Sequence, residues 1–477
     1  MFGYYGSYDV IVCGGGTSGI AAAVAAARTG AKTLLIERVG QLGGQMNFSG
    51  PPGFSFAHLF NGRHEQIIAG FAEETHKILL DEGHAWQHNL QPHRGNYTFS
   101  YVDPDWWGLL VYKLLEEAGA ELMLHSLVTE VIKEDNVVKG VICEHPGGKS
   151  IVLGKVVIDC TGEGEVCYQA GAEYEIAPKS ILEPATVAFT ADGVNWDEVV
   201  KYIHEHIDDM IFNQLHNPYN EWSDDKIRKR VLELNDIRDI GEVMGYLSLK
   251  RHGTWTGEWH NMSGVGFFIM PKGDKILAHF QHSSQLDQVD CTDVRDITKV
   301  EIECRRQNMM AWRFFKKYIP GFENAYITRT CPETRIRETR RIIGDYILKR
   351  EDIAEGKKFP DVIGKSAFPT GAKHAVNGRA LALEKSEQVK DLGSNDIPYR
   401  VLVVKGLENL MVAGKAVSAD RASHQRFLQQ TIVTGQAAGT AAALCARKGI
   451  TPRKMEADVT ELQDNLRKQG VILEGVH

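Results

Sequence analysis

The sequence predicts an α/β fold from three patterns of apolar residues. A short apolar run at 9–13 leads through a glycine-rich turn and an alanine-rich helical stretch to a second apolar run at 33–36, which is typical of a strand–helix–strand unit. Strand-like runs separated by hairpin-type turns follow within 128–159 and predict an antiparallel meander. After residue 395, a strand that ends on glycine and a helix of small residues return to the character of the first unit.

These patterns divide the chain into two expected domains. Residues 1–183 and 396–477 form a discontinuous first domain, with a loop-rich excursion at 50–100. Residues 184–395 form an inserted α+β domain that would cap the first. A chain of 477 residues is long enough for two or three domains.

The individual elements follow from local signals. Asp103 and Pro104 begin a helix as N-cap and first-turn residue, and Gly119 ends it. The other elements expected in the first domain are a helix at 65–80 and strands at 121–126, 128–134, 137–145 and 151–159. In the inserted domain, we expect strands at 186–190, 265–270 and 276–281 and helices at 196–207, 225–234 and 294–318.

The turn at 14–19 reads G-G-G-T-S-G and fits the pattern G-x-G-x-x-G. Gly14 allows the turn, Gly16 lets the backbone approach a pyrophosphate, and Gly19 lets the helix pack closely on the sheet. The phosphates then lie on free N–H groups at the helix N-terminus. Glu37 ends the second strand, where a carboxylate accepts hydrogen bonds from an adenosine ribose. The unit therefore indicates a dinucleotide site, the alternative being a glycine-rich turn in another kind of α/β protein.

Composition limits the partners. The hydrophobic content of 43% and charged content of 24% are typical of a globular protein, and the net charge of −8 gives no general attraction to nucleic acid or anionic lipid. No segment reaches the roughly 20 apolar residues of a membrane span, and the first residues lack signal-peptide character, so we expect a cytoplasmic protein. The eight cysteines form no C-x-x-C pair, which argues against a redox-active disulfide, and no metal-ligand spacing is seen.

Later motifs carry a family resemblance. The stretch 337–346 reads R-E-T-R-R-I-I-G-D-Y, 397–400 reads I-P-Y-R, 409–414 reads N-L-M-V-A-G, and 434–444 reads T-G-Q-A-A-G-T-A-A-A-L. With the opening unit and the meander, these segments resemble FAD-binding proteins of the glutathione-reductase-like class. More closely, they resemble the FAD-dependent oxidoreductase family that carries this late arginine-rich signature. The resemblance spans nearly the full length and implies a Rossmann-like FAD-binding domain.

The resemblance also implies a role for single residues. The FAD pyrophosphate would be held by Gly14, Gly16, Thr17, Ser18 and Gly19, and Thr161 and Gly162 would close over it. At the adenosine end, Glu37 would bind the ribose, Arg38 would lie beside the adenine, and Val128 would contact the adenine through its backbone. The flavin side would be lined by Gly43, Gly44 and Gln45, and Gly414 would mark a second flavin contact. A helix opening at Gly435, Gln436 and Ala437 would direct its positive end at the flavin. Close helix packing alone is the alternative for this last segment.

Candidates for the chemistry lie in three places. His424 and Arg426 fall between the Gly414 strand and the late helix, where His424 would serve as a base and Arg426 matches a family arginine. A dense basic run is formed by Arg335, Arg337, Arg340 and Arg341. On a helix, Arg337 would share one face with Arg340 and with Arg341, and one or two of these arginines could clamp a carboxylate or other anion, the alternative being a salt-bridged structural element. His64 lies in the loop-rich excursion, either over the flavin or simply on the surface.

These features predict an FAD-dependent oxidoreductase, acting as a dehydrogenase, oxidase or reductase by hydride transfer between flavin N5 and a small polar substrate. No second G-x-G-x-x-G unit is present to bind a nicotinamide, so the electron acceptor is left unknown. The alternative is a flavoprotein with a non-redox or partner-dependent role, in RNA modification or as an electron-transfer subunit. The acidic balance disfavours nucleic acid, no membrane contact is expected, and a homo-oligomer is left open.

Overall fold

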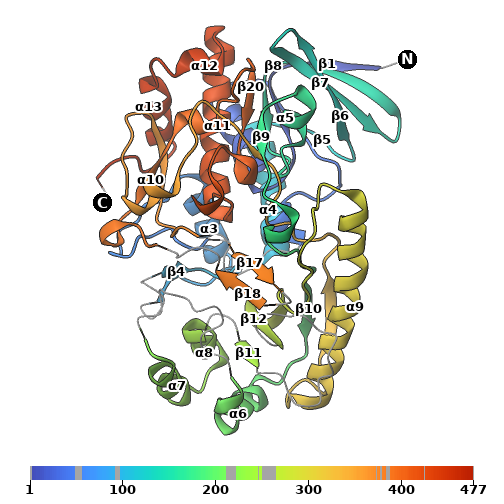
Figure 1. The fold of residues 1–477 in the computed structure, drawn as a ribbon, viewed down its shortest axis with the longest axis vertical. Helices are drawn as coiled ribbons and strands as arrows, with labels where there is room; N and C mark the ends of the chain where they lie inside the picture. Colours follow the sequence, from blue (N-terminus) through green and yellow to red (C-terminus); the bar gives the residue numbers. More distant parts are fainter. Residues whose placement is uncertain are drawn as a thin grey trace.

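The computed structural model describes residues 3–48, 56–91, 97–210, 222–244, 247–249, 265–371, 373–376, 379–382, 387–423 and 425–475. A seven-stranded sheet forms the upper part of the molecule in Figure 1, with the order β5-β2-β1-β8-β7-β6 and with β20 paired to β8. Its strands are β1 (Gly3–Cys13), β2 (Thr33–Ile36), β5 (Glu121–Met123), β6 (Leu127–Glu134), β7 (Val137–His145), β8 (Gly148–Asp159) and β20 (Leu410–Val412).

The α/β fold class predicted from the sequence is confirmed in this sheet. β1 leads through α1 (Thr17–Arg28) to β2, and β1 pairs in parallel with both β2 and β8. β6, β7 and β8 form the antiparallel meander. The carboxyl ends of the parallel strands meet at one edge, which is where ligands bind in sheets of this kind.

Both ends of the chain contribute to this sheet and its cover. β20 pairs in parallel with the carboxyl half of β8, and α11 (Leu428–Lys448) packs against α1. A Cβ added to Gly435 would lie 2.1 Å from the Ser18 carbonyl oxygen, and one added to Gly439 would lie 2.0 Å from that of Ala22. The two helices therefore touch backbone to backbone.

This contact corrects one prediction. The late helix opens at Leu428 and not at Gly435, so Gly435, Gln436 and Ala437 lie inside it. The small residues there serve close packing on α1, and the positive end of the helix is about two turns earlier.

Shorter elements complete the first body. α4 (Pro104–Ala118) has the predicted caps, because the Asp103 side chain accepts from the backbone N–H groups of Asp105 and Trp106 and Gly119 is left-handed. The expected helix at 65–80 begins later, at Phe71, because Gly70 adopts a φ of +60°. The remaining elements of this part are α2 (Gln45–Phe48), α3 (Phe71–Asp81), β3 (Asn89–Gln91), β4 (Tyr97–Phe99), α5 (Glu165–Ala170) and β9 (Tyr174–Glu175).

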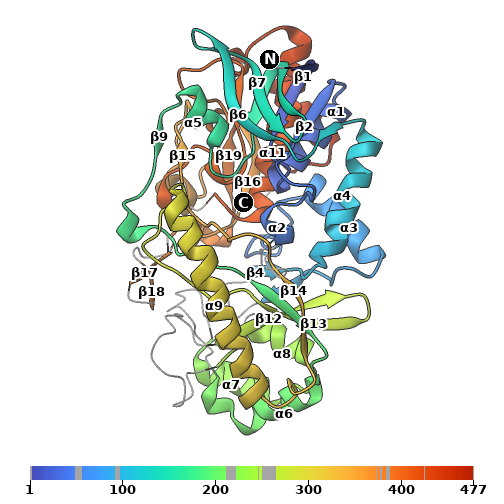
Figure 2. The same cartoon turned by 90° about the vertical axis from the view of Figure 1, so that its right-hand side faces the viewer.

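A second sheet with its own core lies below the first in Figure 1. Its order is β11-β12-β13-β10-β14, from Leu247–Leu249, Val265–Lys272, Lys275–Phe280, Phe189–Asp192 and Tyr326–Thr330. The helices α6 (Trp196–Glu205), α7 (Asp224–Leu232) and α8 (Ile237–Met244) lie around it, and the long α9 (Val294–Tyr318) runs beside it in Figure 2. Phe267, Phe280, Phe315 and Phe322 pack together at its centre.

The chain then returns to the first body. β15 (Arg341–Ile342) pairs with β9, and Leu348 and Ile363 are buried in the same core as α1 and α11. The elements of this return are α10 (Arg350–Ala354), β16 (Val362–Ser366), β17 (Lys373–Val376), β18 (Arg379–Ala382), β19 (Asn395–Pro398), α12 (Pro452–Met455) and α13 (Thr460–Lys468). The domain boundaries at 183 and 395 stay a prediction. Within the ranges described, no helix combines the length and apolar character that a membrane crossing requires.

The helix contact makes a stability prediction. Gly439→Ala places a methyl group against the Ala22 backbone, so α1 and α11 must separate. We expect the free energy of unfolding to fall by about 1–3 kcal/mol, measured by urea denaturation at fixed FAD concentration. An unchanged stability would contradict the close crossing of the two helices.

Candidate functional site

A cavity of about 310 Å³ opens where the carboxyl ends of β1 and β8 meet the first turn of α11. The predicted cofactor residues that line it are Gly14, Gly16, Thr17, Ser18, Glu37, Arg38, Gly44, Gln45, Thr161 and Gly162. Of the predicted catalytic residues, Arg337 and Arg426 line it. One cavity therefore joins the glycine-rich turn at the start of the chain to the arginine-rich segment near its end.

The glycines of the turn have different physical reasons. Gly14 has a φ of +103°, and an added Cβ there would lie 2.5 Å from the Cys160 carbonyl oxygen. A Cβ on Gly19 would lie 1.8 Å from the Gly14 carbonyl oxygen, so the turn itself requires glycine at both positions. At Gly16 the nearest atom is the Cα of Gly44 at 4.0 Å. No described protein atom crowds Gly16, and a Cβ there would only occupy the cavity.

The loop at 43–45 is joined to this turn through the backbone. Gly43 donates to the Gly15 carbonyl oxygen at 2.8 Å and has a φ of +113°. Gly44 and Gln45 then face the cavity, and Gln45 donates to the carbonyl oxygen of Thr334 at 3.2 Å. The loop thereby links the first sheet to the segment that precedes the arginine-rich signature.

The other end of the cavity is acidic. The buried Glu37 carboxylate accepts from the Gly15 and Val39 backbone N–H groups at 2.6 and 3.1 Å. Arg38 pairs with Glu333 at 2.7 Å. Burial, and then the charges of Glu163 and Asp159, raises the pKa of Glu165 to about 7. Glu165 also lines the cavity. The sequence did not predict this residue, because its raised pKa depends on neighbours that only the fold brings near.

Other predicted cofactor residues lie away from the cavity lining. Gly414 packs against α1, since an added Cβ would lie 2.6 Å from Ser18 Oγ. The Val128 carbonyl oxygen accepts from Gln169 Nε2 at 3.4 Å. The residues in this group are Gly19, Gly43, Val128, Gly414, Gly435, Gln436 and Ala437. In place of Gly435, the first turn of α11 reaches the cavity with Phe427, Leu428 and Thr431.

Of the two predicted histidines, the structure describes His64, which lies away from the cavity. His64 is exposed in a turn, where its backbone N–H donates to the Asn61 carbonyl oxygen at 3.0 Å. It does not line the cavity. His424 lies outside the described residues.

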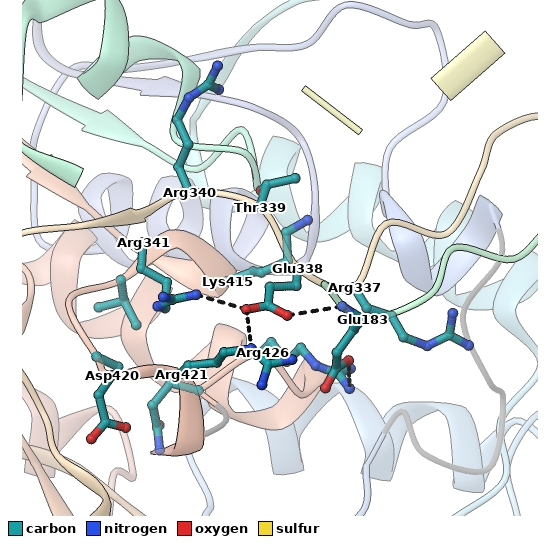
Figure 3. Close-up of a pocket in the computed structure, with 13 residues that line it drawn as sticks. Glu183, Arg337, Glu338, Thr339, Arg340, Arg341, Lys415, Asp420, Arg421 and Arg426 are labelled. Atoms are coloured by element: carbon teal, nitrogen blue, oxygen red, sulfur yellow. Dashed lines mark hydrogen bonds and ion pairs between the residues drawn. The ribbon is translucent and has the colours of Figure 1, made fainter. Parts of the chain in front are cut away.

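The arginine-rich signature is not helical, so the expectation of one shared helical face is wrong. Residues 337–340 are irregular, and β15 begins at Arg341. Arg340 points away from the group around Arg337 in Figure 3, with its guanidinium 4.2 Å from the ring centre of Tyr168. Arg337 instead donates to the Pro184 carbonyl oxygen at 2.6 Å and faces the cavity.

Glu338 organises a second, smaller cavity beside the first (Figure 3). Its carboxylate accepts from Arg341 at 3.0 Å, from Arg421 at 2.8 Å and from the Glu183 backbone N–H at 3.1 Å. Three separate chain segments are thereby held together. The interpretation of the signature as a salt-bridged structural element thus describes Arg341, while Arg337 lines both cavities.

Three arginines meet on the wall of the larger cavity: Arg335, Arg337 and Arg426. Arg426 is paired with Glu183 at 2.5 Å. Burial, and then the charges of Arg337 and Arg426, lowers the pKa of Arg335, and burial and Arg426 lower the pKa of Arg337 to about 10. Arg335 belongs to the basic run recognised in the sequence and precedes the family signature by two residues.

One group of metal-ligand type forms among the described residues, although no spacing in the sequence predicts it. Glu73 and His76 on α3 and His88 have their ligand atoms within 4.8 Å of one another. In this structure His88 Nε2 lies 3.3 Å from Glu73 Oε2, and His76 Nε2 lies 3.2 Å from the Trp86 carbonyl oxygen. These side chains therefore hydrogen-bond within the protein.

The fold and the glycine-lined cavity define a dinucleotide-binding α/β protein. The chain matches the model of the FAD dependent oxidoreductase family over residues 9–466, and it belongs to that family. FAD is its cofactor, and the open space beside Gly16 at the N-terminus of α1 fits a pyrophosphate. No curated protein sequence matches the chain.

Three of the solved structures that the chain matches are similar to it at low sequence identity. A geranylgeranyl bacteriochlorophyll reductase-like protein from Thermoplasma acidophilum is 16% identical, covering 97% of this chain and 87% of that one with a TM-score of 0.45. The p-nitrophenol 4-monooxygenase PnpA of Pseudomonas putida DLL-E4 is 11% identical over 99% and 90%, with a TM-score of 0.47. The myxobacterial chondrochloren halogenase CndH is 12% identical over 98% and 80%, with a TM-score of 0.48.

Two glycine variants separate folding from cofactor binding. Gly16→Ala should fold normally and weaken FAD binding, because its methyl group meets only the cavity. Gly19→Ala should unfold at lower urea even without FAD, because its methyl group meets the Gly14 backbone. Urea denaturation of the apoproteins and FAD titration by flavin fluorescence measure the two effects. Equal loss of apoprotein stability in both variants would contradict this assignment.

The pKa of Glu165 predicts a pH dependence of FAD affinity. Above a pH of about 7, ionised Glu165 adds negative charge to a cavity that receives the FAD phosphates, so affinity should fall as the pH rises. We expect a two- to tenfold rise in the dissociation constant between about pH 6 and about pH 8, screened by salt. Glu165→Gln should abolish this slope, and the exposed Glu130→Gln should keep it. A slope that persists in Glu165→Gln would assign the proton to another group.

Proposed function

We propose that the protein transfers a hydride between N5 of FAD and a small polar substrate, as a dehydrogenase, oxidase or reductase. The observation that carries the proposal is the shared cavity, in which the glycine-rich turn and the three arginines Arg335, Arg337 and Arg426 face the same space. Bound FAD supplies the redox chemistry, and the chain's residues bind and orient both partners.

The cofactor roles follow from the lining. Gly16, Thr17 and Ser18 hold the pyrophosphate at the N-terminus of α1, and Thr161 and Gly162 close over it. Glu37 and Arg38 lie at the adenosine end, and Gln45 at the flavin end. The first turn of α11 presents N–H groups to the flavin end, because the first N–H groups of a helix have no carbonyl partner within it. These groups give the helix N-terminus a partial positive charge.

The substrate roles fall to the arginine wall. Arg337 and Arg426 are each fixed by a neighbour, at Pro184 and Glu183, and so hold a polar substrate in one orientation. His424 remains our proposal for the base that accepts a proton as the hydride leaves. The electron acceptor is a separate molecule, which the second half of the catalytic cycle requires.

Anaerobic flavin reduction tests the proposal. The purified FAD complex is mixed with hydroxy acids, amino acids, polyols and glycosides, and loss of the visible flavin absorbance is followed by stopped flow. We expect one class to bleach the flavin, and Arg426→Ala to slow bleaching about a hundredfold while FAD remains bound, because orientation is lost. For the reductase direction, the chemically reduced complex is mixed with unsaturated acids and reoxidation is followed.

The control is Arg306→Ala on the exposed side of α9, which should bleach at the unaltered rate. The proposal is contradicted if no member of either panel changes the redox state of the flavin while a chemical reductant does so readily.

A further inference from the structure

We infer that the substrate is an anion, a small carboxylate, whose charged group is bound by Arg335, Arg337 and Arg426 on the wall of the cavity. The inference rests on the proposed function, since it names the chemical class that the hydride-transfer site accepts. It extends that proposal by assigning a role to Arg335.

Charge balance is the first observation. The three guanidinium groups line one cavity, and Glu183 is the carboxylate paired with them, through Arg426. Three positive charges and one negative charge leave two positive charges in this group.

Neighbouring acidic groups are already engaged elsewhere. Glu338 pairs with Arg341 and Arg421, and Glu163 pairs with Lys415. Asp420 accepts from the backbone N–H groups of Arg350 and Ser423. Glu301 and Glu333, which also line the cavity, pair with Arg305 and Arg38. None of these ion pairs involves Arg335 or Arg337, whose charges can therefore attract an anionic ligand.

Two donor nitrogens of these arginines lack a hydrogen-bond partner in the described part of the protein. Nη1 of Arg335 and Nε of Arg426 are buried and have no hydrogen-bond partner among the described residues. A guanidinium group stays protonated in proteins, so its burial next to like charges does not make it lose its proton. The buried positive charge attracts an anion instead. A carboxylate can accept two parallel N–H bonds from such a group.

The position of the wall favours a substrate over the cofactor's own phosphates. The pyrophosphate already has a site at the glycine turn and the N-terminus of α1. Arg335 and Arg337 come from the segment that follows the second sheet, and Arg426 directly precedes α11. The N-terminus of α11 adds a further positive end to the same side of the cavity.

Anion binding to the FAD complex tests the inference without turnover. The probes are malonate, succinate and inorganic phosphate, with malonamide as the neutral match, and binding is read from the visible flavin spectrum at constant ionic strength. We expect a saturable change with at least one carboxylate and none with malonamide. Arg335→Met should raise the carboxylate dissociation constant at least about tenfold, because a charged hydrogen bond is lost.

Control variants guard against a folding artefact. Arg335→Lys keeps the charge and should bind more tightly than Arg335→Met, Arg337→Met should show the same loss, and the exposed Arg306→Met should bind as the parent does. The FAD content of each variant is measured alongside.

The contrary outcomes are distinct. The inference is overturned if malonamide binds as tightly as the carboxylates, or if none of the probes binds. It is also overturned if Arg335→Met and Arg337→Met bind carboxylates as tightly as the parent protein does. Loss of FAD with retained folding in Arg335→Met would assign the wall to the cofactor phosphates and overturn it too. Flavin reduction by a neutral polyol, independent of Arg335, would keep the proposed hydride transfer and remove only the anionic substrate. Carboxylate binding through Arg335 without any flavin redox change would instead remove the hydride transfer.

Discussion

The site depends on the direct crossing of α1 and α11. Gly435 and Gly439 lie against the backbone of Ser18 and Ala22, so the two helices touch backbone to backbone at these two positions. This contact fixes the C-terminal part of the chain relative to the glycine-rich turn that begins α1. The first turn of α11 and Arg426 therefore reach the same cavity as Gly16, although more than 400 residues separate them in sequence.

The arginines near this crossing form two groups with different roles. Arg341 and Arg421 both form ion pairs with Glu338, and these ion pairs help to hold three chain segments together. Arg335, Arg337 and Arg426 line the larger cavity, and Arg426 pairs with Glu183. Burying like charges costs free energy unless an anion compensates them, so a stable fold would not collect these groups around a cavity without a ligand to bind.

The sequence predicted the parts of the fold that depend on local signals. The strand–helix–strand unit, the meander and the capped helix at Asp103 to Gly119 are confirmed, because periodicity and caps act over a few residues. The start of α11 was misplaced, because the small residues at 435–439 report a helix contact and not a helix end. Glu165 was missed as a site residue, and Arg335 was noted only as part of the basic run, since the environment of both is made by distant segments.

A crystal structure of the FAD complex soaked with malonate tests the central claim most directly. The account predicts the pyrophosphate beside Gly16, the isoalloxazine ring beside the first turn of α11, and a malonate carboxylate on the guanidinium groups of Arg335 and Arg426. An isoalloxazine ring at the Glu37 end of the cavity, or an α11 whose first turn lies away from the flavin, would contradict it.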